Sequence, residues 1–109
     1  MGLTGPIPVS IGQLKFLSEL KLQENQLTGT LPAEIGEMAA LELFKISNNS
    51  MQGLIPSEFG QLVNLVKLSL DGNSFTGAIP QEVCDNETPE QEIVRDCVVE
   101  CACCTPDCV

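Results

Sequence analysis

Residues 14–37 read LKFLSELKLQENQLTGTLPAEIGE, and the pattern of this stretch recurs twice more along the chain. Residues 38–61 read MAALELFKISNNSMQGLIPSEFGQ, and residues 62–83 read LVNLVKLSLDGNSFTGAIPQEV. Leu, Ile, Met or Phe recurs at the same places in each unit, as do Asn, Gly and Pro. The step from Leu20 to Phe44 equals the step from Phe44 to Leu68, and we call it the repeat period. A fixed period of this kind predicts a repeat architecture in which each unit forms one coil of a stack.

The residue types within a unit explain why such coils would stack. In Leu20-Lys21-Leu22 and its equivalents, buried and exposed side chains alternate, as a strand with one buried face requires. A single coil cannot bury its own apolar side, so neighbouring coils must create the core between them. Proline has a fixed φ and no N–H, so Pro32, Pro56 and Pro80 are expected to end an extended segment and open a short 3₁₀ turn.

Three asparagines follow the expected strands at the same spacing: Asn25, Asn49 and Asn73. An amide side chain that turns inward needs hydrogen-bond partners, because leaving it unpaired costs about 1–3 kcal/mol. Aligned asparagines satisfy this need by bonding the backbone of the turns around them. The sequence therefore predicts a continuous structural ladder of asparagines.

The full unit reads L-x-x-L-x-x-L-x-L-x-x-N-x-L-x-G-x-I-P-x-x-I-G-x and resembles the 24-residue, plant-type leucine-rich repeat. Residues 27–32 (LTGTLP) and 75–80 (FTGAIP) carry the specific part of this motif. The resemblance implies an α/β-type solenoid, a right-handed superhelix with a parallel β-sheet on its concave side and short 3₁₀ turns on its convex side. We expect leucine-rich repeats over 1–83, with a partial unit 1–13 and full units 14–37, 38–61 and 62–83, followed by a C-terminal cap over 84–109.

The expected cap contains all six cysteines of the chain: Cys84, Cys97, Cys101, Cys103, Cys104 and Cys108. Cysteines clustered at the end of a solenoid suggest a disulfide-sealed cap, and disulfides imply an oxidising compartment. The sequence leaves the pairing open, and zinc or another soft metal held by four thiolates is the alternative chemistry. The cysteine-rich end is also similar to those of predicted algal leucine-rich repeat proteins.

The local structure of the cap admits two interpretations. Residues 88–91 (TPEQ) have the pattern of a capping box with Pro at the first helical position, which favours a short helix. The repeat phase favours a final edge strand over residues 93–96, because Val94 lies one repeat period after Leu70. Glu92, at a leucine position, opposes the strand. We predict the strand, with a turn before it.

Composition excludes several functions. The net charge is −10, so nucleic acid and anionic lipid are disfavoured as partners. The chain has no apolar run long enough to span a bilayer. It contains no His, which removes Ser-His and Cys-His nucleophile pairs and His-containing zinc sites. The sequence thus predicts a protein that is not an enzyme, with no cofactor and no membrane segment.

Ligand recognition on such a scaffold belongs to the exposed strand positions. Equivalent positions on neighbouring strands lie about 4.8 Å apart and form columns across the sheet. Lys21 and Lys45 share a column with Ser69, and two adjacent lysines could anchor a carboxylate or sulfate of a partner. The alternative is that they neutralise nearby acids. The candidate ligand-binding residues on the concave face are Glu19, Lys21, Gln23, Leu43, Lys45, Ser47, Lys67, Ser69 and Asp71.

These observations predict a non-catalytic, extracellular recognition module that binds a protein, peptide or glycan through its concave face. The resemblance implies kinship with the ectodomain repeats of plant receptor-like proteins, receptor-like kinases and cell-wall inhibitor proteins. The alternative is a purely structural C-terminal capping segment of a longer array. The sequons at Asn48 and Asn86 predict a glycoprotein of the secretory pathway, either secreted or the ectodomain of a membrane protein.

The N-terminal end bears on the same choice. Met1 falls at the Asn position of a repeat whose strand is missing, so Leu3, Ile7 and Ile11 are expected to face water. Terminal repeats normally carry a polar cap over this edge. We expect the chain to be the C-terminal part of a longer array, or a short protein that self-associates through this edge.

Overall fold

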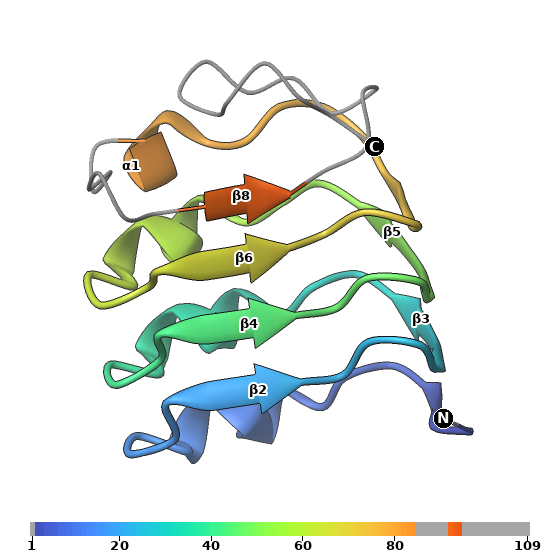
Figure 1. Cartoon of the computed structure of the whole chain (residues 1–109), viewed down its shortest axis with the longest axis horizontal. Helices are drawn as coiled ribbons and strands as arrows, with labels where there is room; N and C mark the ends of the chain where they lie inside the picture. Colours follow the sequence, from blue (N-terminus) through green and yellow to red (C-terminus); the bar gives the residue numbers. More distant parts are fainter. Residues whose placement is uncertain (1, 85–91, 95–109) are drawn as a thin grey trace.

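Strands of successive coils lie side by side in two parallel sheets (Figure 1). The structure is a computed structural model and describes residues 2–84 and 92–94. The first sheet has the order β2 (Glu19–Lys21), β4 (Leu43–Lys45), β6 (Lys67–Ser69) and β8 (Glu92–Val94). The second sheet has the order β1 (Thr4–Gly5), β3 (Gln26–Gly29), β5 (Ser50–Gly53) and β7 (Ser74–Phe75).

Short helices complete each coil on the side away from the first sheet. Three are 3₁₀ helices, η1 (Val9–Gln13), η2 (Ala33–Glu37) and η3 (Ser57–Gln61), and a proline in extended conformation precedes each of them. At the equivalent place in the last coil, α1 (Gln81–Cys84) follows Pro80. The predicted solenoid, with parallel strands and short 3₁₀ turns, is confirmed.

The first sheet keeps the register that the sequence predicts over its first three strands. Glu19 pairs with Leu43, which pairs with Lys67, so partners are one repeat period apart. The middle residue of each strand points into the core, where Leu20, Phe44 and Leu68 are 8%, 0% and 0% exposed. The residues on either side of it point outward from β2 and β4.

The core is a dry stack of apolar side chains between the sheets and the short helices. Ile35, near the end of one unit, and Met38 and Leu41, at the start of the next, all have 0% exposure. Phe44 from β4 and Phe59 from η3 meet in the interior with ring centroids 6.1 Å apart. Aromatic pairs at this separation contribute about 0.5–1.5 kcal/mol beyond the burial of their area.

The second sheet is a feature that the sequence pattern did not predict. Each of its longer strands ends at the regularly spaced glycine, and Gly29 and Gly53 have φ values of 81° and 87°. A residue with a side chain is strained in this left-handed region, so glycine is required for the bend. The bend returns the chain toward the next short helix and closes the coil.

The final strand was predicted with the wrong bounds. β8 spans Glu92–Val94 rather than 93–96, and Ile93 pairs with Leu68, whereas the repeat period would have placed Glu92 opposite Leu68. Ile93 is 7% exposed. A shift by a single position exchanges the two faces of a strand, so the unaltered period would have turned Glu92 into the core. The strand also excludes the alternative of a helix that includes Ile93.

In the partial unit 1–13, Ile7 is more buried than expected. Ile7 is 6% exposed, whereas Leu3 is 53% exposed and Ile11 is partly buried. Ile7 occupies the place that Leu31 and Ile55 occupy in the next two units, and its side chain joins the same core cluster. The expectation that Ile7 faces water was therefore wrong.

Asn49 links its own turn to the coil before it. The Leu27 N–H donates to Asn49 Oδ1 at 3.0 Å. Asn49 Nδ2 in turn donates to the carbonyl oxygens of Leu22 at 2.9 Å, Ile46 at 3.0 Å and Ser47 at 3.3 Å. One amide side chain thus satisfies backbone groups of two successive coils.

Asn25 and Asn73 repeat this arrangement in the first and third coils. The Leu3 N–H donates to Asn25 Oδ1 at 3.1 Å, and the Met51 N–H donates to Asn73 Oδ1 at 3.0 Å. Asn73 Nδ2 also reaches back to the Ile46 carbonyl at 2.9 Å. The three amides therefore lie in one file along the stack.

Replacing Asn49 with alanine should lower the free energy of unfolding by at least about 2 kcal/mol, because each backbone group left unpaired costs about 1–3 kcal/mol. Urea unfolding measures the loss. Gln52, an exposed amide on β5, provides the matched control, and Gln52→Ala should cost less than about 0.5 kcal/mol. Equal losses in the two variants would contradict the role assigned to Asn49.

Candidate functional site

The strand residues predicted to contact a ligand lie on the outward face of the first sheet. Two columns cross this face. Glu19, Leu43 and Lys67 form one column, and the pairs Lys21–Lys45 and Lys45–Ser69 form the other. Gln23, Ser47 and Asp71 follow the strands at equivalent positions and are half-buried.

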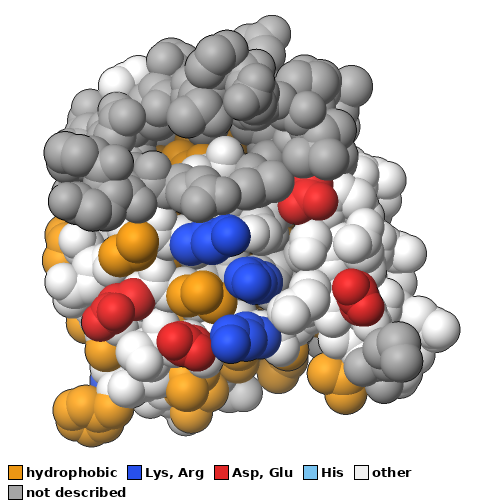
Figure 2. Space-filling model, in the orientation of Figure 1, with side chains coloured by type: hydrophobic (Ala, Val, Ile, Leu, Met, Phe, Trp, Pro, Cys, Tyr) orange, Lys and Arg blue, Asp and Glu red, His pale blue; other side chains and the backbone are white. Residues whose placement is uncertain are grey.

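Lysines gather across the centre of this face (Figure 2). We call Lys21, Lys45 and Lys67 the lysine cluster. Lys21 and Lys45 are direct neighbours on β2 and β4, and Lys67 lies on the next strand, one column away. Leu43, half-buried beside Lys45 on β4, adds an apolar surface to the cluster. Positive charge is therefore concentrated on one face of a chain whose net charge is −10.

The acids of this face compensate the cluster only in part. Lys21 Nζ lies 3.4 Å from Glu19 Oε1, and both side chains are more than half exposed, at 52% and 58%. An exposed pair of this kind contributes about 0–1 kcal/mol and is easily exchanged for another partner. Within residues 2–84 and 92–94, the Lys45 ammonium group has neither an ion pair nor a hydrogen bond. Neutralisation by nearby acids thus applies to Lys21 but not to Lys45.

Ser69 was expected to be exposed, but it is 6% exposed, although it lies at the outward position of β6 beside Lys45. It lies in the third strand, where Val94 of β8 pairs with it. The second column therefore offers Lys21 and Lys45 to a ligand, and the candidate surface is smaller than the sequence suggested.

The turns that follow the strands carry a second set of polar groups. Gln23 Oε1 is buried and has no hydrogen-bond partner among the described residues. Glu24 and Asn48, at equivalent positions, have φ values of 59° and 58°, in the left-handed region. Asn48, the acceptor of the first sequon, is exposed at this turn. Asn86, the acceptor of the second, lies outside the described residues.

The predicted cysteine cap lies outside the described part of the chain, apart from the backbone of Cys84. The same is true of the alternative thiolate metal site. Within the described residues no group of three or more Cys, Asp or Glu side chains is placed to hold a metal ion.

One exposed residue was missed by sequence reasoning. Phe16 is 95% exposed in the loop before β2. The equivalent residues of the next units are Ala40 and Asn64, so this position lies outside the apolar template of the repeat. That mismatch was the available signal, because the repeat pattern requires no large apolar side chain at this position.

The sequence matches the family model of the leucine rich repeat over residues 15–75. This match covers more than half of the chain, and the chain belongs to the leucine-rich repeat family. Comparison with the curated proteins gives no match.

Solved structures of plant receptors share the fold. The plant peptide hormone receptor RGFR1, solved in complex with RGF2, has a TM-score of 0.76 and 37% identity over 85% of this chain and 16% of its own. The Arabidopsis receptor kinase HAESA, solved with the peptide hormone IDA and the co-receptor SERK1, has a TM-score of 0.78 and 30% identity over 87% and 16%. The BIR3–SERK2 complex from Arabidopsis thaliana has a TM-score of 0.74 and 32% identity over 93% of this chain and 56% of the matched chain.

The chain thus spans about a sixth of the two peptide-binding receptors and 56% of the matched chain from the third structure. Among the residues that the structure describes, no helix has the length and apolar character needed to cross a membrane.

The burial of Ser69 generates a prediction. Ser69→Lys should lower the free energy of unfolding by about 2 kcal/mol or more, because a charged group would have to leave water. Ser47, half-buried in the turn after the neighbouring strand, is the control, and Ser47→Lys should cost less than about 1 kcal/mol. Chemical denaturation of both variants measures the two losses of stability. A fully stable Ser69→Lys protein would show that this position is open to solvent.

Proposed function

We propose that the chain is a non-catalytic, extracellular recognition module that binds an acidic peptide, or an acidic segment of a protein, across the first sheet. The observation that carries the proposal is the lysine cluster, with the Lys45 ammonium group left without an acidic partner among the described residues. The peptide complexes of the similar receptors RGFR1 and HAESA support a peptide as the type of ligand.

The chemistry of the face favours an anionic ligand. An extended peptide that crosses β2 and β4 would bring its carboxylates to the ammonium groups of Lys21 and Lys45, whose strands lie about 4.8 Å apart. Leu43 lies next to Lys45 along β4 and provides a contact for an apolar side chain. A sulfated glycan offers the same charge without the apolar group, so it is a weaker match to this surface.

A structural role as a capping segment is the second candidate. The size of the face favours it, because each strand of the first sheet has only three residues and Ser69 is not accessible. A stable protein interface needs roughly 800 Å² from each partner, which is large for a surface of this kind. Under this alternative the lysines would serve solubility alone.

The extracellular location rests on the tail and the sequons. We infer that the cysteines of residues 84–109 form disulfides that cover the last coil, and that Asn48 and Asn86 carry glycans. The exposure of Asn48 supports its use as an acceptor. The similar solved structures include receptor ectodomains, which supports the same compartment.

Lys45→Glu should abolish most of the binding to acidic peptides. The probe is an array of short synthetic peptides that differ in the number of Asp and Glu residues, with a sulfated oligosaccharide as a second arm. Affinity should rise with the number of acids and fall with added salt, and Lys45→Glu should weaken it at least about tenfold, or 1.4 kcal/mol.

Lys15→Glu is the matched control, because Lys15 lies in a loop before β2 and pairs with Glu37 at 3.4 Å, away from the lysine cluster. It makes the same change of net charge and should leave affinity within about twofold. Equal losses of affinity in both variants would show that the effect comes from net charge and not from the position of Lys45. If the protein bound none of the peptides, the capping role would be favoured. Preference for the oligosaccharide would shift the proposal to glycans.

The cap is tested by the intact mass of the protein secreted from eukaryotic cells. After enzymatic removal of glycans, reduction should add one hydrogen atom for each cysteine, and it should lower the free energy of unfolding by about 2–5 kcal/mol for each structurally important bridge. An unchanged mass on reduction, together with a bound zinc ion, would establish the thiolate alternative.

A further inference from the structure

Two apolar side chains stand beside the lysine cluster at positions where the repeat does not require them. Leu43 lies on the outward face of β4, where the equivalent residues Glu19 and Lys67 are charged. Val66 is 42% exposed directly before β6, and the two preceding units have a serine and a glutamate at this position. We call Leu43 and Val66 the apolar pair. The scaffold does not account for it, because polar side chains occupy the same places in other units.

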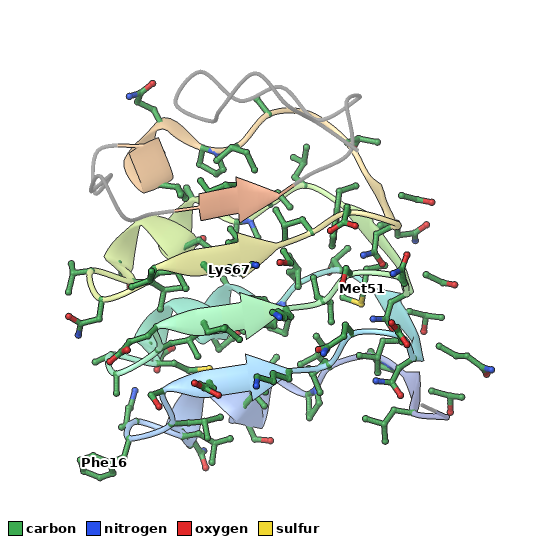
Figure 3. The ribbon with its side chains drawn as sticks, viewed as in Figure 1. Phe16, Met51 and Lys67 are labelled. Carbon is green, nitrogen blue, oxygen red and sulfur yellow. The ribbon has the colours of Figure 1, made fainter. Side chains whose placement is uncertain are left out.

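The two residues of the apolar pair lie on adjacent strands. The Val66 N–H donates to the carbonyl oxygen of Glu42 at 2.7 Å, and Glu42 directly precedes Leu43. Lys67, which follows Val66 at the start of β6 (Figure 3), is the register partner of Leu43. The apolar pair therefore lies diagonally between β4 and β6, at the end where both strands begin.

The charges around the apolar pair differ from those around Lys45. Leu43 lies between Glu19 and Lys67 in its column, and the exposed Glu42 precedes it, so acids outnumber bases there. In the other column the register partners of Lys45 are Lys21 and Ser69, and positive charge dominates. A carboxylate of a ligand is therefore attracted to the end of β4 and not to its start.

The geometry of β4 sets the spacing of the groups that a ligand must carry. Leu43 and Lys45 both point outward, and the buried Phe44 separates them. Two residues of a strand span about 6.6 Å. In an extended peptide, side chains on the same face are also two residues apart. Such a peptide can place a carboxylate at Lys45 and an apolar side chain at Leu43 at the same time.

From these features we propose that the apolar pair is a second subsite of the binding face, which receives an apolar side chain two residues away from the acidic residue of the ligand. This inference rests on the proposed function and specifies its ligand as a peptide segment that carries both groups. The segment runs diagonally, from Lys21 and Lys45 across β4 toward Val66. Two side chains are too small for the core of a protein interface, which uses roughly 800 Å² from each partner, but they match one side chain of a peptide.

NMR titration of the full chain with short synthetic peptides of blocked termini tests the spacing. All peptides contain one Asp and one Leu among Gly and Ser, and they differ only in the separation of Asp from Leu. Peptides with the two residues two positions apart, in either order, should bind at least about tenfold more tightly than peptides in which they are adjacent. The reason is that adjacent side chains of an extended chain point to opposite faces.

Serine variants test the apolar pair itself. Val66→Ser and Leu43→Ser should each remove most of the preference and leave the affinity for the adjacent-residue peptides within about twofold. The fold should tolerate both changes, because polar residues occupy these positions in other units. Val63→Ser is the matched control. Val63 is 66% exposed in the loop before β6, and its loss should leave the preference intact.

Added salt provides a second readout. Salt screens the contact between a carboxylate and exposed lysines but does not weaken the contact between apolar side chains. All affinities should therefore fall with salt, whereas the ratio between the two spacings should persist. A ratio that disappeared with salt would assign the preference to charge alone and would contradict the apolar subsite.

The remaining outcomes separate this inference from the proposed function. If binding required Lys45 but showed no preference for spacing, the apolar subsite would be wrong and the lysine site would stand. A preference that survived in both Leu43→Ser and Val66→Ser, or that was lost equally in Val63→Ser, would lead to the same conclusion. If none of the peptides bound, both the proposed function and the subsite would be overturned.

Discussion

Hydrogen bonding by inward-facing amides holds the coils of this protein in register. Asn49 binds backbone groups on two successive coils at once, and Asn25 and Asn73 do the same on either side of it. Apolar burial alone favours stacking but does not fix how one coil sits on the next. The amide file fixes that position, so outward side chains of successive strands come to lie in columns.

The columns connect the scaffold to its candidate function. Because Lys21 lies beside Lys45, charges that are one repeat period apart in sequence act together on one surface. The lysine cluster lies on the outward side of the first sheet, whereas the exposed ring of Phe16 projects from the loop before β2 (Figure 3).

Sequence reasoning predicted the solenoid and the columns of the first three strands because the fixed period encodes them. It missed the second sheet, since strands such as Gln26–Gly29 lie in a stretch where the motif marks a bend and not a strand. It placed β8 out of register by a single position, because a period gives no warning of an added residue. The alternation of the strand also did not encode the burial of Ser69, which occupies an outward position like that of Lys45 and is nevertheless inaccessible.

The added residue between Leu68 and Ile93, beyond one repeat period, has a consequence for how such chains can change in length. An insertion is accommodated where the segment between two coils can absorb it and still return an apolar side chain to the interior. The same addition inside a strand or beside an inward-facing asparagine would disrupt the hydrogen bonds that align Asn25, Asn49 and Asn73. Whole units, in contrast, could be duplicated or deleted between residues 37 and 38 without altering the type of any contact. The array can therefore change in length only by whole units, whereas insertions of single residues are tolerated in the segments that connect the coils.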